Sequence, residues 1–416
     1  MSSVFPRLRC LFSNSRTATA TATTKSKRSP VVPNKPRRHE QNLPTNSLPA
    51  VTDVGSNGVV TKRRPMSERE KMLRREVNKF KKASESEKFR GRFIPYETIV
   101  RRLVSNKQFP WVEEIIEHQK KYPEIADERF CVRLLMLYGK AGMFDHARKL
   151  FDEMPEFKCE RTVKSLNALL DACVESKQYE KFNDLIHELH GKMNVKPDIV
   201  TYNTIVKAFC QQGSLDRALS MIDVMDKVGV EADVITFNTL MEAFFKSGRV
   251  DDAEKIEEMM NKKNIAINIR TCNVKLRGLM AQRRTSDAVE LFSKLETMGL
   301  QPDVYTFNAL IQGFRDEENL EEAKRWYNEM MKCGIAPDKV TYINLIPLLC
   351  ERGDSDMALS LCKHLIKDCV LMPRIMLQMV VDELVSESKT DEAIELIGLG
   401  KANKYFRYHL ELLPNK

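Results

Sequence analysis

Residues 199–233 read IVTYNTIVKAFCQQGSLDRALSMIDVMDKVGVEAD, and this stretch decides the fold because it recurs along the chain. A similar text, VITFNTLMEAFFKSGRVDDAEKIEEMMNKKNIAIN, follows at 234–268. After a divergent copy, VYTFNALIQGFRDEENLEEAKRWYNEMMKCGIAPD occupies 304–338. The period is 35 residues. Repetition at such a period is typical of arrays in which each copy is one small structural unit.

Each copy contains two stretches with the apolar spacing of amphipathic helices. In 199–233 they are Tyr202, Ile205 and Phe209, then, after Gly213, Leu215, Ala218, Ile222 and Met225. Gly229 is placed to end the second helix, and Asp198 and Asp233 are placed to cap the first helices of successive copies. A single helix pair cannot bury its apolar faces, so neighbouring pairs must stack. The sequence therefore predicts an all-α fold, an α-solenoid.

The repeated text resembles the pentatricopeptide repeat (PPR) family of 35-residue helical hairpins. The residues that carry the resemblance are TYN at 201–203, TFN at 236–238 and 306–308, and Pro-Asp pairs at 197–198, 302–303 and 337–338. The resemblance implies a right-handed superhelix that binds RNA in an organelle.

Nine helix-turn-helix units follow one another between residues 93 and 408. They are 93–127, 128–162, 163–198 (one residue longer, near 191–194), 199–233, 234–268, 269–303, 304–338, 339–373 and 374–408. Alanine recurs at the twentieth position, as Ala147, Ala218, Ala253, Ala288, Ala323, Ala358 and Ala393, with Val112 and Phe182 in its place in the first and third units. We interpret this recurrence as close helix packing. Residues 405–413 are expected to cover the end of the array, and 409–416 form the C-terminal tail.

The first 65 residues differ in composition from the repeats, with 12 Lys/Arg and 2 Asp/Glu. Arg7, Arg9 and Arg16 stand among Ser, Thr and Ala in a segment that has no acidic residue before residue 25. This composition predicts a transit peptide and a disordered linker. It favours the mitochondrion, with the chloroplast as the alternative. A basic tail without a targeting role is the other interpretation.

Residues 66–92 predict a charged N-terminal cap helix that begins with a capping box of Ser67 and Glu70. Its ten basic residues either contact phosphates or form a solvated cap over the first repeat.

The formal net charge of +9 belongs to the front of the chain. Residues 66–416 hold 55 basic and 56 acidic side chains, and 93–416 hold 45 and 51. The ten Cys include no CxxC pair, which favours buried reduced thiols over disulfides or a metal site. No run approaches the roughly 18 apolar residues of a membrane span. We expect a soluble protein without a membrane partner, and a repeat array that is close to neutral.

In the PPR family, the fifth and last residues of each unit line the concave face and select one RNA base per repeat. Carried over to this chain, the pairs are Asn167 with Asp198, Asn203 with Asp233, Asn238 with Asn268, Asn273 with Asp303, and Asn308 with Asp338. An Asn amide offers a donor and an acceptor to a pyrimidine edge, and the closing Asp or Asn adjusts the preference between U and C. The resemblance implies the reading U, U, C or U, U, U from the 5′ end. Alternatively, Asp is only a helix cap and Asn is retained from an ancestral repeat.

The second residue of each unit sandwiches the base in this family. Here it is Val200, Ile235, Tyr305 and Val340 in regular copies, while Lys164 and Arg270 are placed to reach phosphate. The flanking units depart at the fifth position, which holds Glu97, Val132, Ile343 and Gln378. At most five units can read bases. Because a neutral array gains little from counterion release, we expect weak RNA binding by the array alone.

The sequence predicts a binding protein and not an enzyme. It contains no Gly-rich phosphate loop, no HExxH, no zinc-deaminase signature and no Asp cluster of a fused nuclease. We expect no cofactor and no small-molecule substrate.

Residues 77–155 include the phrases VNKF, SESEKF, VRRLV, VEEIIE, QKKY, LYGKAGMF and FDEMP. With these phrases the segment resembles the short plant mitochondrial PPR proteins of the mitochondrial ribosomal small subunit. That resemblance implies a role in translation, in which the partners are single-stranded RNA, including ribosomal RNA, and mitochondrial small-subunit proteins. One alternative is a free, transcript-specific factor for RNA stability, processing or splicing. Another is a protein-binding scaffold like tetratricopeptide arrays.

Overall fold

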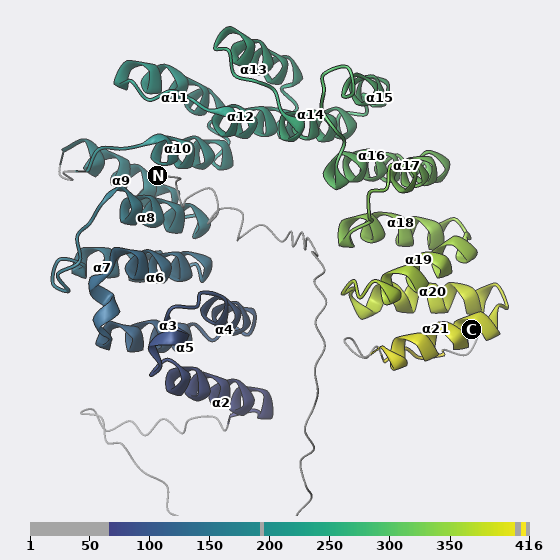
Figure 1. Cartoon of the computed structure of the whole chain (residues 1–416), viewed down its shortest axis with the longest axis horizontal. Helices are drawn as coiled ribbons and strands as arrows, with labels where there is room; N and C mark the ends of the chain where they lie inside the picture. The colour runs from purple at the N-terminus through teal and green to yellow at the C-terminus, as the bar shows by residue number, and fades with distance from the viewer. Residues whose placement is uncertain (1–65, 192–194, 404–408, 413–416) are drawn as a thin grey trace, which may run out of the picture. The chain divides into compact units, whose positions relative to one another are not determined.

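The computed structural model describes residues 66–191, 195–403 and 409–412, and in these residues the chain is helical without any strand (Figure 1). The predicted transit peptide and linker, residues 192–194 of the insertion near 191–194, and most of the segment 405–413 lie outside the described residues.

The described helices form nine successive pairs after a short N-terminal cap. The cap consists of α2 (Glu68–Ala83) and α3 (Glu87–Arg90). The pairs are α4 (Ile94–Ser105) with α5 (Phe109–Glu117), α6 (Glu128–Lys140) with α7 (Phe144–Glu153), α8 (Val163–Glu175) with α9 (Tyr179–Gly191), α10 (Ile199–Gln211) with α11 (Leu215–Val228), α12 (Val234–Lys246) with α13 (Val250–Lys262), α14 (Ile269–Ala281) with α15 (Thr285–Lys294), α16 (Val304–Asp316) with α17 (Leu320–Lys332), α18 (Lys339–Glu351) with α19 (Ser355–Lys367), and α20 (Arg374–Ser386) with α21 (Thr390–Ala402). Two 3₁₀ turns, His118–Lys121 and Pro123–Ala126, follow α5.

The first helix of each pair packs on the first helices of its neighbours, so the array is an α-solenoid, as the sequence predicts. Large side chains such as Phe237, Phe307 and Tyr342 are fully buried between units. The recurring alanines are all at most 1% exposed. This confirms that the twentieth position serves close packing, since a larger side chain there would force the two helices of a pair apart.

The helix ends follow the sequence signals. Gly229 ends α11 in the left-handed conformation (φ 73°), which is easily reached without a Cβ. Asp198 and Asp233 cap α10 and α12, each accepting the backbone N–H of the third helical residue. Both predictions are confirmed.

The C-terminal segment packs back onto α20. Gln378 donates through Nε2 to the carbonyl of Glu411 at 2.7 Å and accepts the Glu411 backbone N–H through Oε1 at 3.1 Å. Leu410 is 3% exposed. The fifth residue of the last unit, Gln378, is therefore hydrogen-bonded to the segment 409–412.

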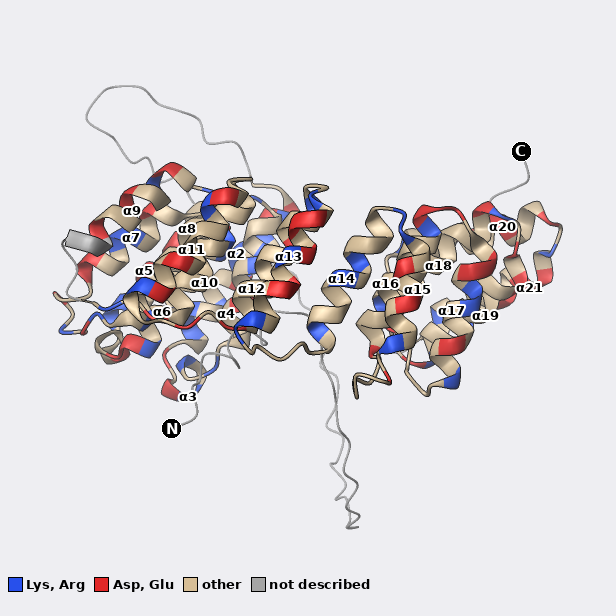
Figure 2. Ribbon diagram, turned by 90° about the horizontal axis from the view of Figure 1, so that it is seen from above, with Lys and Arg blue, Asp and Glu red and all other residues tan. Residues whose placement is uncertain are grey.

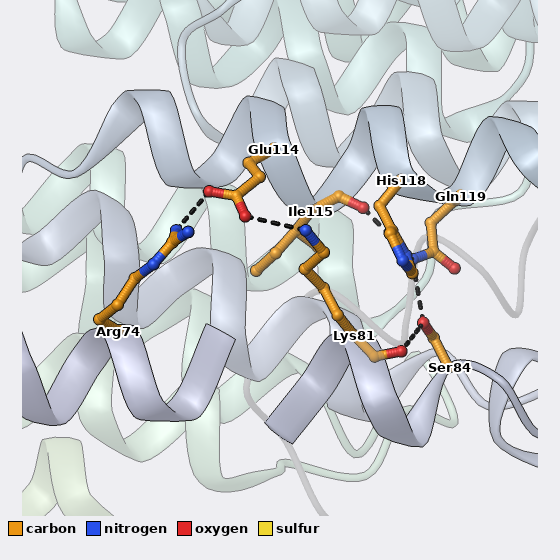
Figure 3. A network of polar contacts seen from close by, with 7 residues as sticks. All are labelled: Arg74, Lys81, Ser84, Glu114, Ile115, His118 and Gln119. Carbon is orange, nitrogen blue, oxygen red and sulfur yellow. Dashed lines mark hydrogen bonds and ion pairs between the residues drawn. The ribbon is translucent and has the colours of Figure 1, made fainter. Parts of the chain in front are cut away.

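The cap helix α2 begins at Ser67 with the predicted capping box, in which Ser67 and Glu70 bond each other's backbone N–H. Its buried side, Leu73, Val77 and Phe80, joins the core. Beside this apolar side, Arg74 and Lys81 both donate to the carboxylate of Glu114 on α5, Lys81 at 2.9 Å (Figure 3).

This attachment should weaken in acid. The pKa of Glu114 lies below its usual range because Arg74, and then Lys81, donate to the carboxylate and outweigh the effect of burial. A carboxyl with a depressed pKa stabilises the fold above its unfolded pKa of about 4.3, and that contribution is lost as pH falls through the folded pKa. We expect Glu114→Gln to cost about 1 kcal/mol of unfolding free energy at pH 7. The difference from the unmodified protein should shrink towards pH 3 in thermal melts. A difference that stays constant with pH would contradict this role.

Candidate nucleic-acid interface

Four of the five predicted fifth-position amides lie against the closing carboxylate of the same unit. The Asn Nδ2 to Asp Oδ1 distances are 3.0 Å for Asn167–Asp198, 3.1 Å for Asn203–Asp233, 2.9 Å for Asn273–Asp303 and 2.9 Å for Asn308–Asp338. The Asn lies on the first helix of its unit, and the Asp caps the first helix of the next unit. The stacking of these two helices thus brings together residues 30 or 31 positions apart.

A threonine of the following unit completes each pair. Its hydroxyl donates to the Asn Oδ1, from Thr201 to Asn167 (2.7 Å), Thr236 to Asn203 (2.5 Å), Thr306 to Asn273 (2.7 Å) and Thr341 to Asn308 (2.8 Å). The same hydroxyl accepts the backbone N–H of the capping Asp. We call each such set of Asn, closing Asp and next-unit Thr a junction triad. It links two units through buried hydrogen bonds.

The expectation of an open row of amides offering both donor and acceptor is wrong for these four. Asn167, Asn203, Asn273 and Asn308 are only 3–5% exposed. The physical reason is that the closing Asp caps the next helix and, with the Thr, draws the amide into the junction. Two groups of each pair make no hydrogen bond to a described residue: the second N–H of the Asn and the Oδ2 of the Asp. The bonds that these carboxylates make to described residues all go to Oδ1.

The fifth predicted pair, Asn238 with Asn268, does not close in this way. Asn268 caps α14 by accepting from the Thr271 N–H at 3.0 Å and from its hydroxyl at 3.2 Å. Asn238 is half-buried, and its Oδ1 is buried with no hydrogen-bond partner among the described residues. The Thr271 hydroxyl keeps the bond to its own helix cap that the other four threonines also make, and only the bond to the fifth-position Asn is missing.

The second residues stand at the surface of the same helix ends. Tyr305 and Val340 are 45% and 44% exposed, and Val200 and Ile235 are half-buried. Ile375 occupies the same position of the last unit and is 66% exposed. The sequence prediction did not include Ile375, although the 35-residue period marks it. Flat or branched apolar side chains in this row can pack against base faces.

The charges on this face are mostly compensated. Positions 2, 5 and 9 of a helix share one face. Lys207, at position 9 of its unit, lies 3.2 Å from Asp171 and 2.7 Å from Glu175. Figure 2 shows acidic and basic segments interleaved over the helices of the array. By contrast, Lys164 and Arg270 are exposed and form no ion pair with a described residue. Among the described residues, the face therefore carries scattered unpaired cations and no continuous basic strip.

The fifth residues of the flanking units are engaged elsewhere. Glu97 accepts from Lys140 at 2.5 Å, and Val132 is buried in the core. Among residues 66–191, 195–403 and 409–412, no cluster of three or more His, Cys, Asp or Glu has the arrangement of a metal site. None of the helices in these ranges combines the length and apolarity needed to cross a bilayer.

The repeats match models of known protein families. A model described as "PPR repeat family" matches residues 161–211, 197–241, 232–281, 267–316 and 306–351, and one described as "PPR repeat" matches 132–159. Two small ribosomal subunit proteins of Arabidopsis thaliana are similar. One is mS78 (rPPR3a), 49% identical over 157 residues, which are 38% of this chain and 39% of that protein. The other is mS79 (rPPR3b), 48% identical over 150 residues, which are 36% of this chain and 38% of that protein.

The similar region thus spans less than half the length of these relatives. Among solved structures, PPR10 from maize aligns with a TM-score of 0.48 and 24% identity, covering 74% of this chain and 44% of that one. The family models together cover more than half of the sequence. The chain therefore belongs to the pentatricopeptide repeat family.

Proposed function

We propose that this protein binds single-stranded RNA along the junction triads and does so as a component of the small subunit of the mitochondrial ribosome. The observation that carries the RNA-binding part is the repeated pairing of an Asn amide with a closing Asp at 2.9–3.1 Å in four units. The pairing holds an amide N–H and a carboxylate oxygen side by side in each of the four units, which supports the proposal that these groups read bases.

The remaining donors and acceptors suit pyrimidines. The free N–H of each Asn can donate to a pyrimidine carbonyl, and the Asp Oδ2 can accept the N3–H of uracil. At Asn268 a carboxamide replaces the carboxylate and can donate to N3 of cytosine. The second residues, from Val200 to Val340, would hold the base faces. This arrangement supports the reading U, U, C or U, U, U for the five units.

The ribosomal part of the proposal is supported by the identity of nearly one half to mS78 and mS79. It also fits the charge of the array, because 45 basic against 51 acidic residues in 93–416 give little electrostatic affinity for free RNA. A weak reader works better when other proteins hold it beside its RNA. The Arg-containing, acid-free first 24 residues support import into the mitochondrion.

Sedimentation tests the ribosomal assignment. We expect the tagged full-length chain in a mitochondrial lysate prepared without nuclease to co-sediment with small ribosomal subunits. The chain should move to light fractions when RNase treatment dissolves the subunits. A chain that stays in light fractions in both lysates would contradict the ribosomal role. If that light pool carried one messenger RNA, the chain would be a free transcript-specific factor.

A further inference from the structure

We propose that the exposed face of α2 is a second RNA contact that grips the phosphate backbone of helical RNA. The face is formed by Arg75, Lys79 and Lys82, which are all solvent-exposed. Their spacing of four and three residues places them on one side of the helix. This proposal rests on the proposed function in one respect, that the protein works beside RNA. It does not depend on base reading by the junction triads, because the α2 face contains none of their residues.

The opposite side of α2 holds the helix in place. Leu73, Val77 and Phe80 are buried there. Two further basic residues, Arg74 and Lys81, point towards α5 and are neutralised by Glu114 (Figure 3). Besides Arg69 and Lys71 in its first turn, the basic residues of α2 are therefore divided between an anchoring set and an outward set. The anchoring set keeps the outward set at fixed positions, which lowers the entropy cost of binding.

The outward set has no internal counter-charge. Arg75, Lys79 and Lys82 form no ion pair with any residue of the described ranges. Of the nearby acids, Glu70 belongs to the helix capping box and Glu76 pairs with Arg102 at 2.8 Å, while Glu85 is exposed and forms no ion pair with Lys82. In the array, by contrast, cations such as Lys207 lie beside carboxylates. The α2 face is thus a concentrated basic surface next to a nearly neutral array.

The chemistry of this face favours phosphates over unpaired bases. At a rise of about 1.5 Å per residue, the three cations span roughly 10 Å in a straight line. Within α2 (residues 68–83) the aromatic residue, Phe80, is buried on the opposite side, and the exposed apolar residue beside the three cations is Met72 (45% exposed). Single-stranded RNA is typically held by stacking on aromatic rings, whereas helical RNA is recognised through its phosphates and shape.

Salt dependence tests the number of contacts. We compare the full-length chain with the triple variant Arg75→Gln/Lys79→Gln/Lys82→Gln on a 20-base-pair RNA duplex. Three lost phosphate contacts should lower the slope of log K against log salt by about 2.7 and the affinity at physiological salt by about 100-fold. The matched control is Lys227→Gln/Lys262→Gln/Lys367→Gln, which neutralises three exposed cations in the last turns of α11, α13 and α19. This control should bind like the unmodified protein, because its three lysines are not part of the α2 face. The basic N-terminal segment is the same in all three chains, so it does not contribute to the differences.

Lysine footprinting tests the location directly. The duplex should protect Lys79 and Lys82 from acetylation and leave Lys227, Lys262 and Lys367 reactive. Equal protection of both sets, or an unchanged salt slope in the α2 variant, would overturn the proposal. Protection in an RNase-treated mitochondrial extract but not by the duplex would assign the face to an acidic protein and equally overturn it. Binding of a pyrimidine single strand through the junction triads is measured separately, so a failure of either site can be told from a failure of the other.

Discussion

Replacing Asp233, Asp303 and Asp338 with Asn is expected to turn the base preference of three units from uridine to cytidine. The carboxylate Oδ2 can only accept, which suits the N3–H of uracil, whereas an amide can donate to the unprotonated N3 of cytosine. The chain already uses Asn268 to cap α14 through the same backbone bond. The variant should therefore keep its helix caps.

The expected change is large because three positions act together. A mismatched buried donor or acceptor costs about 1–3 kcal/mol per position. The affinity ratio between the oligomers UCCCC and UUUUU should thus rise by about a hundredfold or more. Competition binding at low salt measures this ratio. The control is Asp223→Asn on the exposed side of α11, which should leave the ratio unchanged. If the triple variant bound both oligomers as the unmodified chain does, the triads would not read bases.

The second expected effect is on stability. Asn203→Ala and Asn308→Ala each remove a buried amide and leave the Thr236 or Thr341 hydroxyl and the closing carboxylate without that partner. Each substitution should cost about 1–3 kcal/mol of unfolding free energy. The two sites lie in separate units, so the costs should add. Chemical denaturation of the single and double variants measures them.

Asn238→Ala is the matched control for this prediction. Asn238 is half-buried, and its Oδ1 has no hydrogen-bond partner among the described residues. Its loss should cost less than about 1 kcal/mol, because no hydrogen bond to that oxygen is broken. Equal costs at Asn203 and Asn238 would show that the triads do not hold the units together. The comparison also matters for binding assays, since reduced RNA binding by Asn203→Ala must be separated from partial unfolding.

The repeat pattern predicted most of the fold, because apolar spacing, Gly229 and the capping Asp residues act locally. The resemblance to the PPR family supplied the Asn and Asp pairs, of which four lie in contact. It did not predict their burial. That depends on Thr236 and its equivalents, which belong to the next unit and which the sequence presents only as part of the family motif. The recurring Thr at the third position was the signal that could have revealed the triads.

Asn238 and the α2 cap show where sequence reasoning stops. The Asn238–Asn268 pair follows the same spacing as the others, yet the Thr271 hydroxyl bonds Asn268 alone and the Asn238 Oδ1 has no partner among the described residues. Whether one hydroxyl reaches both acceptors is set by three-dimensional distance. The segment 66–92, which includes α2, has ten basic residues. Only the packing against Glu114 separates the anchoring cations from the outward ones.

Crosslinking the tagged chain to RNA inside mitochondria, followed by sequencing of the attached RNA, tests the central claim most directly. The account predicts crosslinks concentrated in the ribosomal RNA of the small subunit, at a pyrimidine-rich single-stranded segment. Chains carrying Asp233→Asn, Asp303→Asn and Asp338→Asn should lose crosslinks at that segment. Recovery of no RNA above background, or of RNA with no enrichment for any segment, would contradict it.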